Sequence, residues 1–247
     1  MIRIKKDVVL SLLNEGKNYG EIASIIGVTR NSMGRFCRKN FGLLEDRGKS
    51  QRQSIELTEK QQEILFGELL GDICIQKHCK NYRGNIVHSI KQLEYAQYLH
   101  KELNNIVGIF RFIKVKANNN IYNECQFSIR PNLNLKSFYE NFYGDFNGKK
   151  DIPYNLKLLT PLTIAVWFMD DGFLIDNGHS KTLGFSTCSF SLDGLQRIKK
   201  YLEETYNIKT IIRKNSYLIV KRESALTLKN LIIPYIIDSM KYKVNLD

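Results

Sequence analysis

Two stretches of this chain follow the same pattern. They read "LTEKQQEILFGELLGDICI" and "LTPLTIAVWFMDDGFLI", and each runs from Leu-Thr through a mostly apolar segment to an acid followed by strand-like residues. Thr58 with Gln61 forms a capping box in the first stretch, and Thr160 precedes Pro161 in the second, where proline suits the first helical position. The repeat predicts two equivalent helices that end on Asp72 and Asp171.

The segments after each acid also correspond. Both halves, about 57–155 and 156–247, predict a helix, two strands, a helix, two strands and a helix. We therefore expect an α+β domain over 57–247, a pseudo-symmetric pair of α-β-β-α-β-β-α halves packed through the two repeated helices. Gly67 and Gly71 line one face of the first helix and allow another backbone to approach closely, whereas the second helix offers only Ala165.

The front of the chain predicts a small all-α domain over residues 1–42, with three short helices between residues 5 and 40. Gly27 suits a tight turn and Thr29 can cap the third helix. This spacing resembles a helix-turn-helix module, whose third helix would present side chains to DNA bases and phosphates: Arg30, Asn31, Ser32 and Arg35. An ordinary helical hairpin with a basic surface is the alternative. The polar residues 43–56 predict a linker.

The charge balance predicts a polyanionic partner. Lys and Arg number 37 against 25 Asp and Glu, a formal net charge of +12, and the sequence pI is about 9.4. Five cysteines without a Cys-x-x-Cys pair indicate neither a disulfide framework nor a zinc ribbon. No segment resembles a signal peptide or a membrane span, so we expect a soluble, intracellular protein.

The repeated segments carry a family resemblance. "LFGELLGDI" and "IAVWFMDDG" resemble the two signature helices of single-chain LAGLIDADG homing endonucleases, and the similarity extends over about residues 57–247. "GKKDIPYNLKLLTPLTIAVWFMDDG" is similar to the stretch around the second motif of that family. The chain departs from the pattern at Ile73, which replaces a glycine, and at Val166 and Asp170, where small residues are usual.

The resemblance implies a catalytic metal site at Asp72 and Asp171, binding Mg²⁺ or Mn²⁺, with one acid serving each DNA strand. Two acids brought together at helix C-termini should raise one pKa or recruit a cation, and hard oxygen ligands suit Mg²⁺. Asp170 is rotated by about 100° from Asp171 on a helix, so its role stays open. By resemblance, Lys150 and Lys243 occupy matching positions in the two halves and polarise the attacking water or stabilise the pentacoordinate charge, with Lys149 and Lys241 as the alternatives.

Four strands in each half could form a curved sheet whose polar face lies along a DNA groove. The candidate contacts are polar residues of the expected strands and their ends: Gln76, His78, Asn123, Ser128, Arg130, Lys181, Ser186, Arg213, Lys214 and Lys221. A solvated surface position is the alternative for each of them. The strand "FRFIKVK" alternates in a way that leaves its facing open.

These features predict a monomeric, site-specific endonuclease that cuts double-stranded DNA at a long asymmetric site. The alternatives are a non-cleaving DNA-binding regulator, an RNA-splicing maturase on the same scaffold, and an unrelated basic structural protein. The chain ends show no intein-splicing residues, which favours a free-standing or intron-encoded enzyme.

The two-part organisation predicts the effect of a truncation. Deleting residues 1–45 should weaken DNA binding and leave cleavage in place, because the expected catalytic residues all lie beyond residue 57. Gel-shift and cleavage assays on the same DNA measure the two effects. Loss of all activity in a truncated chain that still folds would contradict the two-part organisation.

Overall fold

A computed structural model describes residues 4–15, 17, 19–41, 55–78, 81–118, 120–214 and 217–246. The chain divides into two compact units, Met1–Gln53 and Ser54–Asp247. Most of the predicted linker, residues 43–54, lies outside the described residues, as do Cys79, Asn119 and Asn215.

The first unit consists of three helices: α1 (Lys6–Asn14), α2 (Tyr19–Ile26) and α3 (Arg30–Phe41). Its small core contains Val9, Tyr19, Ile22, Ala23, Met33 and Cys37. Gly27 has a φ of 76° in the turn between α2 and α3, a conformation that glycine adopts without strain. The Ser32 amide donates to Thr29 Oγ1 at 3.2 Å, so Thr29 caps α3 as its position predicts.

The second unit begins with one α-β-β-α-β-β-α half. Its helices and strands are α5 (Glu59–Leu70), β1 (Cys74–His78), β2 (Asn81–Ser89), α6 (Leu93–Glu102), β3 (Arg111–Ala117), β4 (Asn120–Asn132) and α7 (Leu135–Tyr143). Short 3-10 helices occupy Ile90–Gln92, Asn104–Ile106 and Gly144–Phe146. The strands form one antiparallel sheet in the order β1-β2-β4-β3.

The second half repeats this order. Its elements are α8 (Pro161–Asp171), β5 (Gly172–Asp176), β6 (Lys181–Ser186), α9 (Leu192–Tyr206), β7 (Thr210–Arg213), β8 (Tyr217–Val220) and α10 (Arg222–Ile232), followed by 3-10 helices η4 (Ile233–Tyr235) and η5 (Asp238–Val244). The second antiparallel sheet has the matching order β5-β6-β8-β7. The predicted α+β fold with two equivalent halves is confirmed.

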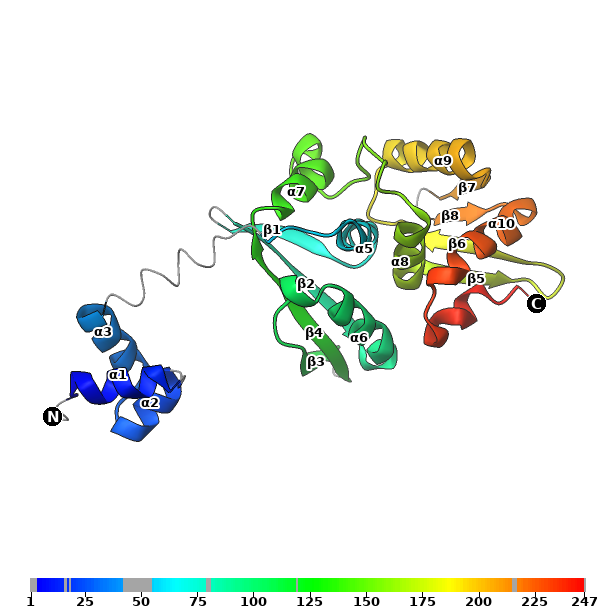
Figure 1. The fold of residues 1–247 in the computed structure, drawn as a ribbon. Helices are drawn as coiled ribbons and strands as arrows, with labels where there is room; N and C mark the ends of the chain where they lie inside the picture. The colour runs from blue at the N-terminus through cyan, green and yellow to red at the C-terminus, as the bar shows by residue number, and fades with distance from the viewer. Residues whose placement is uncertain are drawn as a thin grey trace. The chain divides into compact units, whose positions relative to one another are not determined.

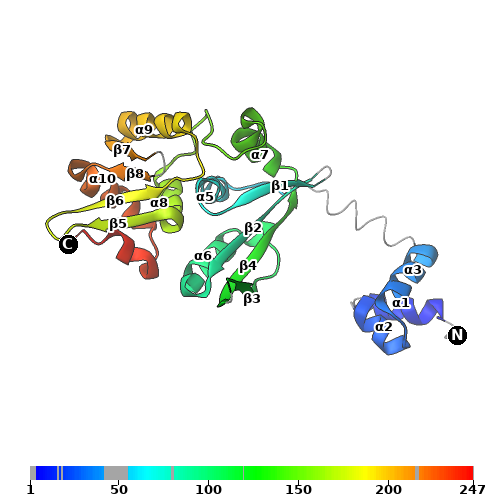
Figure 2. The ribbon, with the colours of Figure 1, turned by 180° about the vertical axis from the view of Figure 1, so that it is seen from behind.

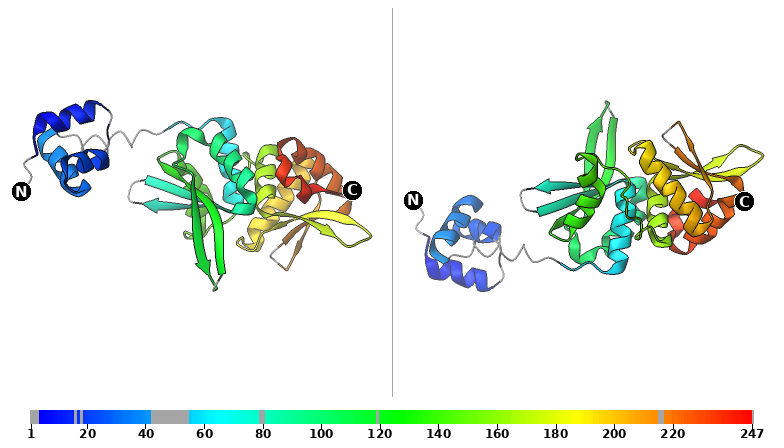
Figure 3. Two further views of the ribbon diagram at one scale, coloured as in Figure 1. Left: turned by 90° about the horizontal axis from the view of Figure 1, so that it is seen from below. Right: turned by 90° about the horizontal axis from the view of Figure 1, so that it is seen from above.

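Helices α5 and α8 lie side by side between the two sheets, as Figure 1 and Figure 2 show from opposite sides. Figure 3 shows the two sheets on either side of this helix pair when the domain is viewed along the perpendicular direction. One continuous core joins both halves, and it includes nearly the whole of α8 from Leu162 to Met169. The shared core explains why these two helices are apolar on almost every face.

The helix pair is packed through glycine on one side and larger side chains on the other. A Cβ atom at Gly67 would lie 2.7 Å from both the Thr163 carbonyl oxygen and Val166 Cβ. A Cβ atom at Gly71 would overlap the Asp170 carboxyl group. The two residues that depart from the small-residue pattern in α8 therefore fill the space that glycine leaves open in α5.

Both helices begin as their sequences predict. Thr58 and Gln61 form a reciprocal capping box at α5, with side chain to backbone distances of 3.2 Å in each direction. Thr160 Oγ1 accepts from the Thr163 amide, and Pro161 occupies the first turn of α8. These caps fix where each helix starts and therefore where its terminal acid lies.

In the part of the chain that the structure describes, none of the helices has the length and apolar character that crossing a lipid bilayer requires.

The tight contact at Gly67 predicts a large cost for a small change. Gly67→Ala should lower the free energy of unfolding of the second unit by about 1–3 kcal/mol, because the added methyl group forces α5 away from α8. Trp167, the one tryptophan of the chain, lies buried in α8, so its fluorescence reports urea unfolding of this unit.

Gly144→Ala is the matched control, since a Cβ there meets only Glu140 Cβ, at an ordinary 3.7 Å. Its stability should stay close to that of the native protein. Equal urea midpoints for both variants would contradict the close packing at Gly67.

Candidate functional site

Asp72 and Asp171 stand at the C-terminal ends of the two packed helices. Asp171 is the last residue of α8, and Asp72 follows Gly71 at the end of α5. The Asp72 side chain is 45% exposed, whereas Asp171 is half-buried. Burial, and then the charge of Asp72, raise the pKa of Asp171 to about 6. The Asp72 carboxylate is thus close enough for its charge to affect Asp171.

A lysine supports each helix end. Lys150 Nζ donates to the carbonyl oxygens of Gly71 at 2.8 Å and Ile73 at 3.1 Å, on either side of Asp72. Lys243 Nζ donates to the carbonyl oxygens of Met169 at 2.6 Å and Asp170 at 3.0 Å. Burial lowers the pKa of Lys243, and the nearby aspartates oppose that effect.

These lysines occupy matching places in the two halves. Each ammonium group lies at the negative end of a helix dipole and binds carbonyl oxygens at, or just beyond, the end of the helix. Lys150 precedes the loop into α8, and Lys243 lies in η5, so each is placed by a segment remote in sequence from the helix end it binds. Of the alternatives, Lys149 is exposed and Lys241 pairs with Asp238 at 2.6 Å on the surface.

A buried polar cluster next to Asp72 was not predicted from the sequence. Glu68, His88 and Asp170 bring ligand-type atoms within 4.8 Å of one another. The Tyr95 hydroxyl group lies 3.0 Å from Glu68 Oε1. Glu68 is fully buried, and desolvation together with the Asp72 charge raises its pKa to about 8. Desolvation also raises the pKa of Asp170 well above its usual range.

The sequence contained weak signals for this cluster. Glu68 is a charged residue within an apolar helical run, which calls for a buried partner. On β2, burial alternates through Tyr82, Gly84 and Ile86 to His88, so period-2 alternation predicts that the histidine faces the core. Neither signal says which side chains meet, because the partners Tyr95 and Asp170 come from other elements.

The predicted nucleic-acid contacts do not all share one surface. The face of each sheet that points away from the core is here called its open face. On the first sheet it carries Gln76, Arg83, Asn85, Arg111, Gln126, Ser128 and Arg130, and on the second Phe173, Ser186, Arg213, Tyr217 and Ile219. Arg111 thereby settles the facing of β3, since it pairs with Gln126 and lines a hollow with Ser128 and Arg130.

Two candidates lie elsewhere. Asn123 shares its side of β4 with the buried Cys125 and Phe127, so it is on the opposite face from Ser128. Lys181 shares its side of β6 with the buried Leu183 and pairs with Asp176 at 4.0 Å.

The remaining candidates are surface positions. Lys214 lines a hollow on the second open face with Arg213, and Lys221 is exposed at the start of α10. In the first unit, Arg30, Asn31, Ser32 and Arg35 are all exposed on α3. The side chain of His78 lies outside the described residues.

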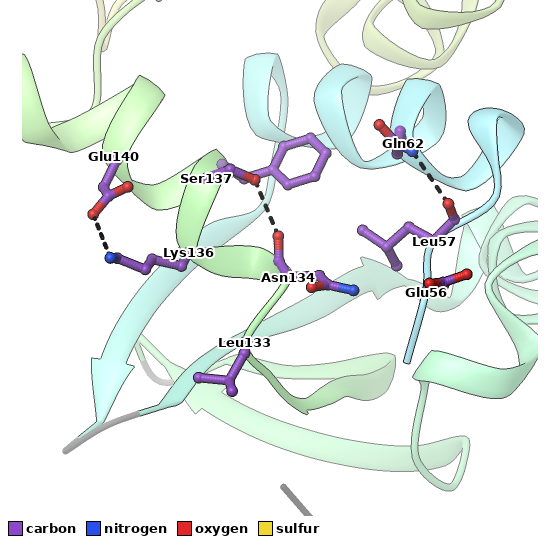
Figure 4. Close-up of a pocket in the computed structure, with 9 residues that line it drawn as sticks. Glu56, Leu57, Gln62, Leu133, Asn134, Lys136, Ser137 and Glu140 are labelled. Carbon is purple, nitrogen blue, oxygen red and sulfur yellow. Dashed lines mark hydrogen bonds and ion pairs between the residues drawn. The ribbon is translucent and has the colours of Figure 1, made fainter. Parts of the chain in front are cut away.

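The hollow shown in Figure 4 lies at the other end of α5. Gln62, in the first turn of α5, donates to the Leu57 carbonyl oxygen at 3.1 Å, and Lys136 pairs with Glu140 at 3.3 Å. A helix of 12 residues separates this hollow from Asp72 by about 18 Å. At that distance the hollow does not contribute to the acid site.

Comparison with known proteins identifies relatives of the second unit. The model of the LAGLIDADG DNA endonuclease family matches residues 62–225. The cytochrome b mRNA maturase bI2 of Debaryomyces hansenii is 30% identical over 203 residues, which cover 76% of this chain and 74% of the relative. The DNA endonuclease I-ChuI of Chlamydomonas applanata is 28% identical over 211 residues, which cover 77% and 97%.

A solved structure also matches. The homing endonuclease I-WcaI bound to its DNA recognition sequence has a TM-score of 0.72 and 25% identity, over 84% of this chain and 94% of that chain. The resemblance predicted for the two repeated helices is confirmed. The matched family region begins within α5 and does not include the first unit.

The raised pKa of Glu68 predicts a pH-dependent stability. Below about pH 4.5 the carboxyl is protonated in both folded and unfolded chains, and between 4.5 and about 8 only the folded chain keeps the proton. The free energy of unfolding should therefore fall with rising pH by up to ~1.4 kcal/mol per unit in this window. Glu68→Gln, which cannot ionise, should reduce the slope.

Urea unfolding followed by Trp167 fluorescence between pH 6 and pH 8, in EDTA, measures this slope. Glu94→Gln is the control, because Glu94 is exposed on α6 and the change should leave the slope intact. An identical slope for native protein and Glu68→Gln would refute the buried, protonated state of Glu68.

Proposed function

The chain belongs to the LAGLIDADG DNA endonuclease family, and we propose that it is a site-specific endonuclease that cuts both strands of duplex DNA with a divalent metal. The observation that carries the proposal is the pair of acids at the ends of two packed helices, each beside a lysine bound to the same helix end. One acid and one lysine from each half provide two equivalent sites in one chain, which supports action as a monomer.

The carboxyl pair fits a divalent cation. Asp171 has its pKa raised by burial and by Asp72, so two ionised carboxylates repel each other there, and a bound cation would remove that repulsion. Asp72 and Asp171 offer the hard oxygen ligands that Mg²⁺ and Mn²⁺ accept. When bound, such an ion activates water and stabilises the leaving oxygen of a phosphodiester.

The lysines support the reaction in two ways. Each ammonium group has three N–H donors, of which two go to carbonyl oxygens at a helix end. This anchoring holds the residue before or after each acid and so fixes the direction of its carboxylate. We assign the third donor of Lys150 and of Lys243 to a phosphate oxygen or to the attacking water, where a positive charge stabilises the pentacoordinate state.

The two open faces are the proposed DNA-contacting surfaces. The first carries three arginines and amide or hydroxyl side chains, a mixture suited to guanine, adenine and phosphate: Gln76, Arg83, Asn85, Arg111, Gln126, Ser128 and Arg130. The second adds Ser186, Arg213 and Lys214 to aromatic Phe173 and Tyr217. Because the two faces differ in sequence, the recognised DNA site would be asymmetric.

The first unit is proposed as an additional DNA-binding module. Its third helix exposes Arg30, Asn31, Ser32 and Arg35, and its turn at Gly27 has the spacing of a helix-turn-helix motif. A module of this size adds binding energy and contributes none of the acids of the metal site.

An RNA-splicing role is the second candidate, favoured by one observation. The similar protein of Debaryomyces hansenii is named a cytochrome b mRNA maturase, and so is a protein of Saccharomyces cerevisiae that is 32% identical over 199 residues, 46% of its length. Stimulation of intron splicing by Asp171→Asn, which should not cut DNA, would separate this role from cleavage.

The metal-site assignment predicts a loss of cleavage without a loss of binding. Asp171→Asn should abolish cutting of both strands in Mg²⁺, because an amide is a poor ligand for a hard cation, while gel-shift affinity stays within about threefold of native. The DNA is obtained first by selecting cleaved sites from a randomised library with the native protein.

Asp145→Asn is the control, since Asp145 is an exposed acid outside the helix pair and its loss should leave cleavage unchanged. Undiminished cutting by Asp171→Asn would exclude the site assignment. Failure of the native protein to cut any library member would exclude the nuclease function itself.

A further inference from the structure

The two halves can be aligned residue by residue through their sheets. The residue two positions after each acid is paired in its sheet: Cys74 faces Asn85 across β1 and β2, and Phe173 faces Gly184 across β5 and β6. Asn85 and Gly184 are therefore equivalent positions, and residues farther along β2 and β6 can be compared directly.

The side chains three residues after Asn85 and Gly184 differ between the two halves. The first half has His88 and the second half has Thr187, and both side chains are buried. His88 Nδ1 lies 3.6 Å from Asp72 Oδ2. The ring also packs against Tyr95, with centroids 5.1 Å apart, which limits how far the imidazole can turn.

The imidazole is suited to orient the carboxylate. A neutral imidazole has one N–H donor and a protonated one has two, so the ring can donate to a carboxylate in either state. A donor at 3.6 Å reaches hydrogen-bond range with a small side-chain rotation. A partner behind a metal ligand fixes the direction of that ligand, and losing it costs 10- to 100-fold in metal affinity or activity.

The second half lacks such a partner. Thr187 Oγ1 is buried and has no hydrogen bond to any described residue, and no described side chain hydrogen-bonds Asp171. The position equivalent to Glu68 is Trp167, which stacks on Phe185 with centroids 4.0 Å apart. Apolar side chains therefore lie below Asp171, whereas polar side chains lie below Asp72.

We propose that His88 is a positioning residue for Asp72 alone, so that the two strand cuts depend on different supporting residues. The proposal rests on the proposed function, and it adds that one strand's rate can be lowered without lowering the other's. Lys150 and Lys243 do not distinguish the two strand cuts, because each half has a lysine bound at the end of its helix.

A duplex labelled differently on its two strands tests the proposal. With His88→Phe, which removes both ring nitrogens and keeps a planar ring, cutting of one strand should slow about 10-fold or more while the other stays within about twofold. Nicked DNA should accumulate. His88→Asn, whose amide group replaces Nδ1, should restore most of the lost rate.

Thr187→Val is the matched control in the other half and should leave the ratio of the two strand rates at its native value. A folding defect slows both strands equally, so the ratio reports positioning alone. Equal slowing of both strands by His88→Phe, or no slowing of either, overturns the proposal.

A measurement without cleavage keeps the contact testable if the native protein proves not to cut DNA. In protein labelled with ¹⁵N-histidine, Asp72→Asn should shift the His88 Nδ1 resonance and Asp171→Asn should leave it in place. Absence of a shift in Asp72→Asn overturns the proposed contact, whatever the outcome for nuclease activity.

Discussion

The contact between α5 and α8 is the interaction on which the rest of the second unit depends. It is close because Gly67 and Gly71 have no side chain where Val166 and Asp170 approach. This packing joins two half-cores into one and places a sheet on each side of the helix pair. It also determines where the two acids lie. Each helix starts at a defined cap, and the two helices pack along their length, so their C-terminal ends lie side by side.

That arrangement has an electrostatic cost that the neighbouring residues offset. Both acids stand at helix C-termini, where the dipole favours a cation, and burial adds to the cost at Asp171. Lys150 and Lys243 bring positive charge to the same helix ends and bind their unpaired carbonyl oxygens. Beneath Asp72, the raised pKa of Glu68 keeps that carboxyl neutral. The region is therefore less negative than its count of acids suggests.

Sequence patterns predicted the halves, the caps and the helix ends because these features are local or repeated. A capping box, a proline in a first turn and a glycine pair can each be recognised from spacing alone. The facing of Arg111 and the side of Asn123 were not predictable, since they depend on which residue pairs with which across β3 and β4. The cluster around Glu68 was missed for the same reason, as its members come from α5, β2, α6 and α8.

The glycine-to-side-chain contact also makes the interface between the halves directional. At the native separation of the helices, two copies of the first half would set glycine against glycine and leave a gap, whereas two copies of the second would set Val166 against Val166 and Asp170 against Asp170. Neither pairing reproduces the native fit, so the contact favours unlike halves over like ones. Val166 and Asp170 thus make α8 complementary to α5 and not to a second copy of itself, so each half is fitted to the other.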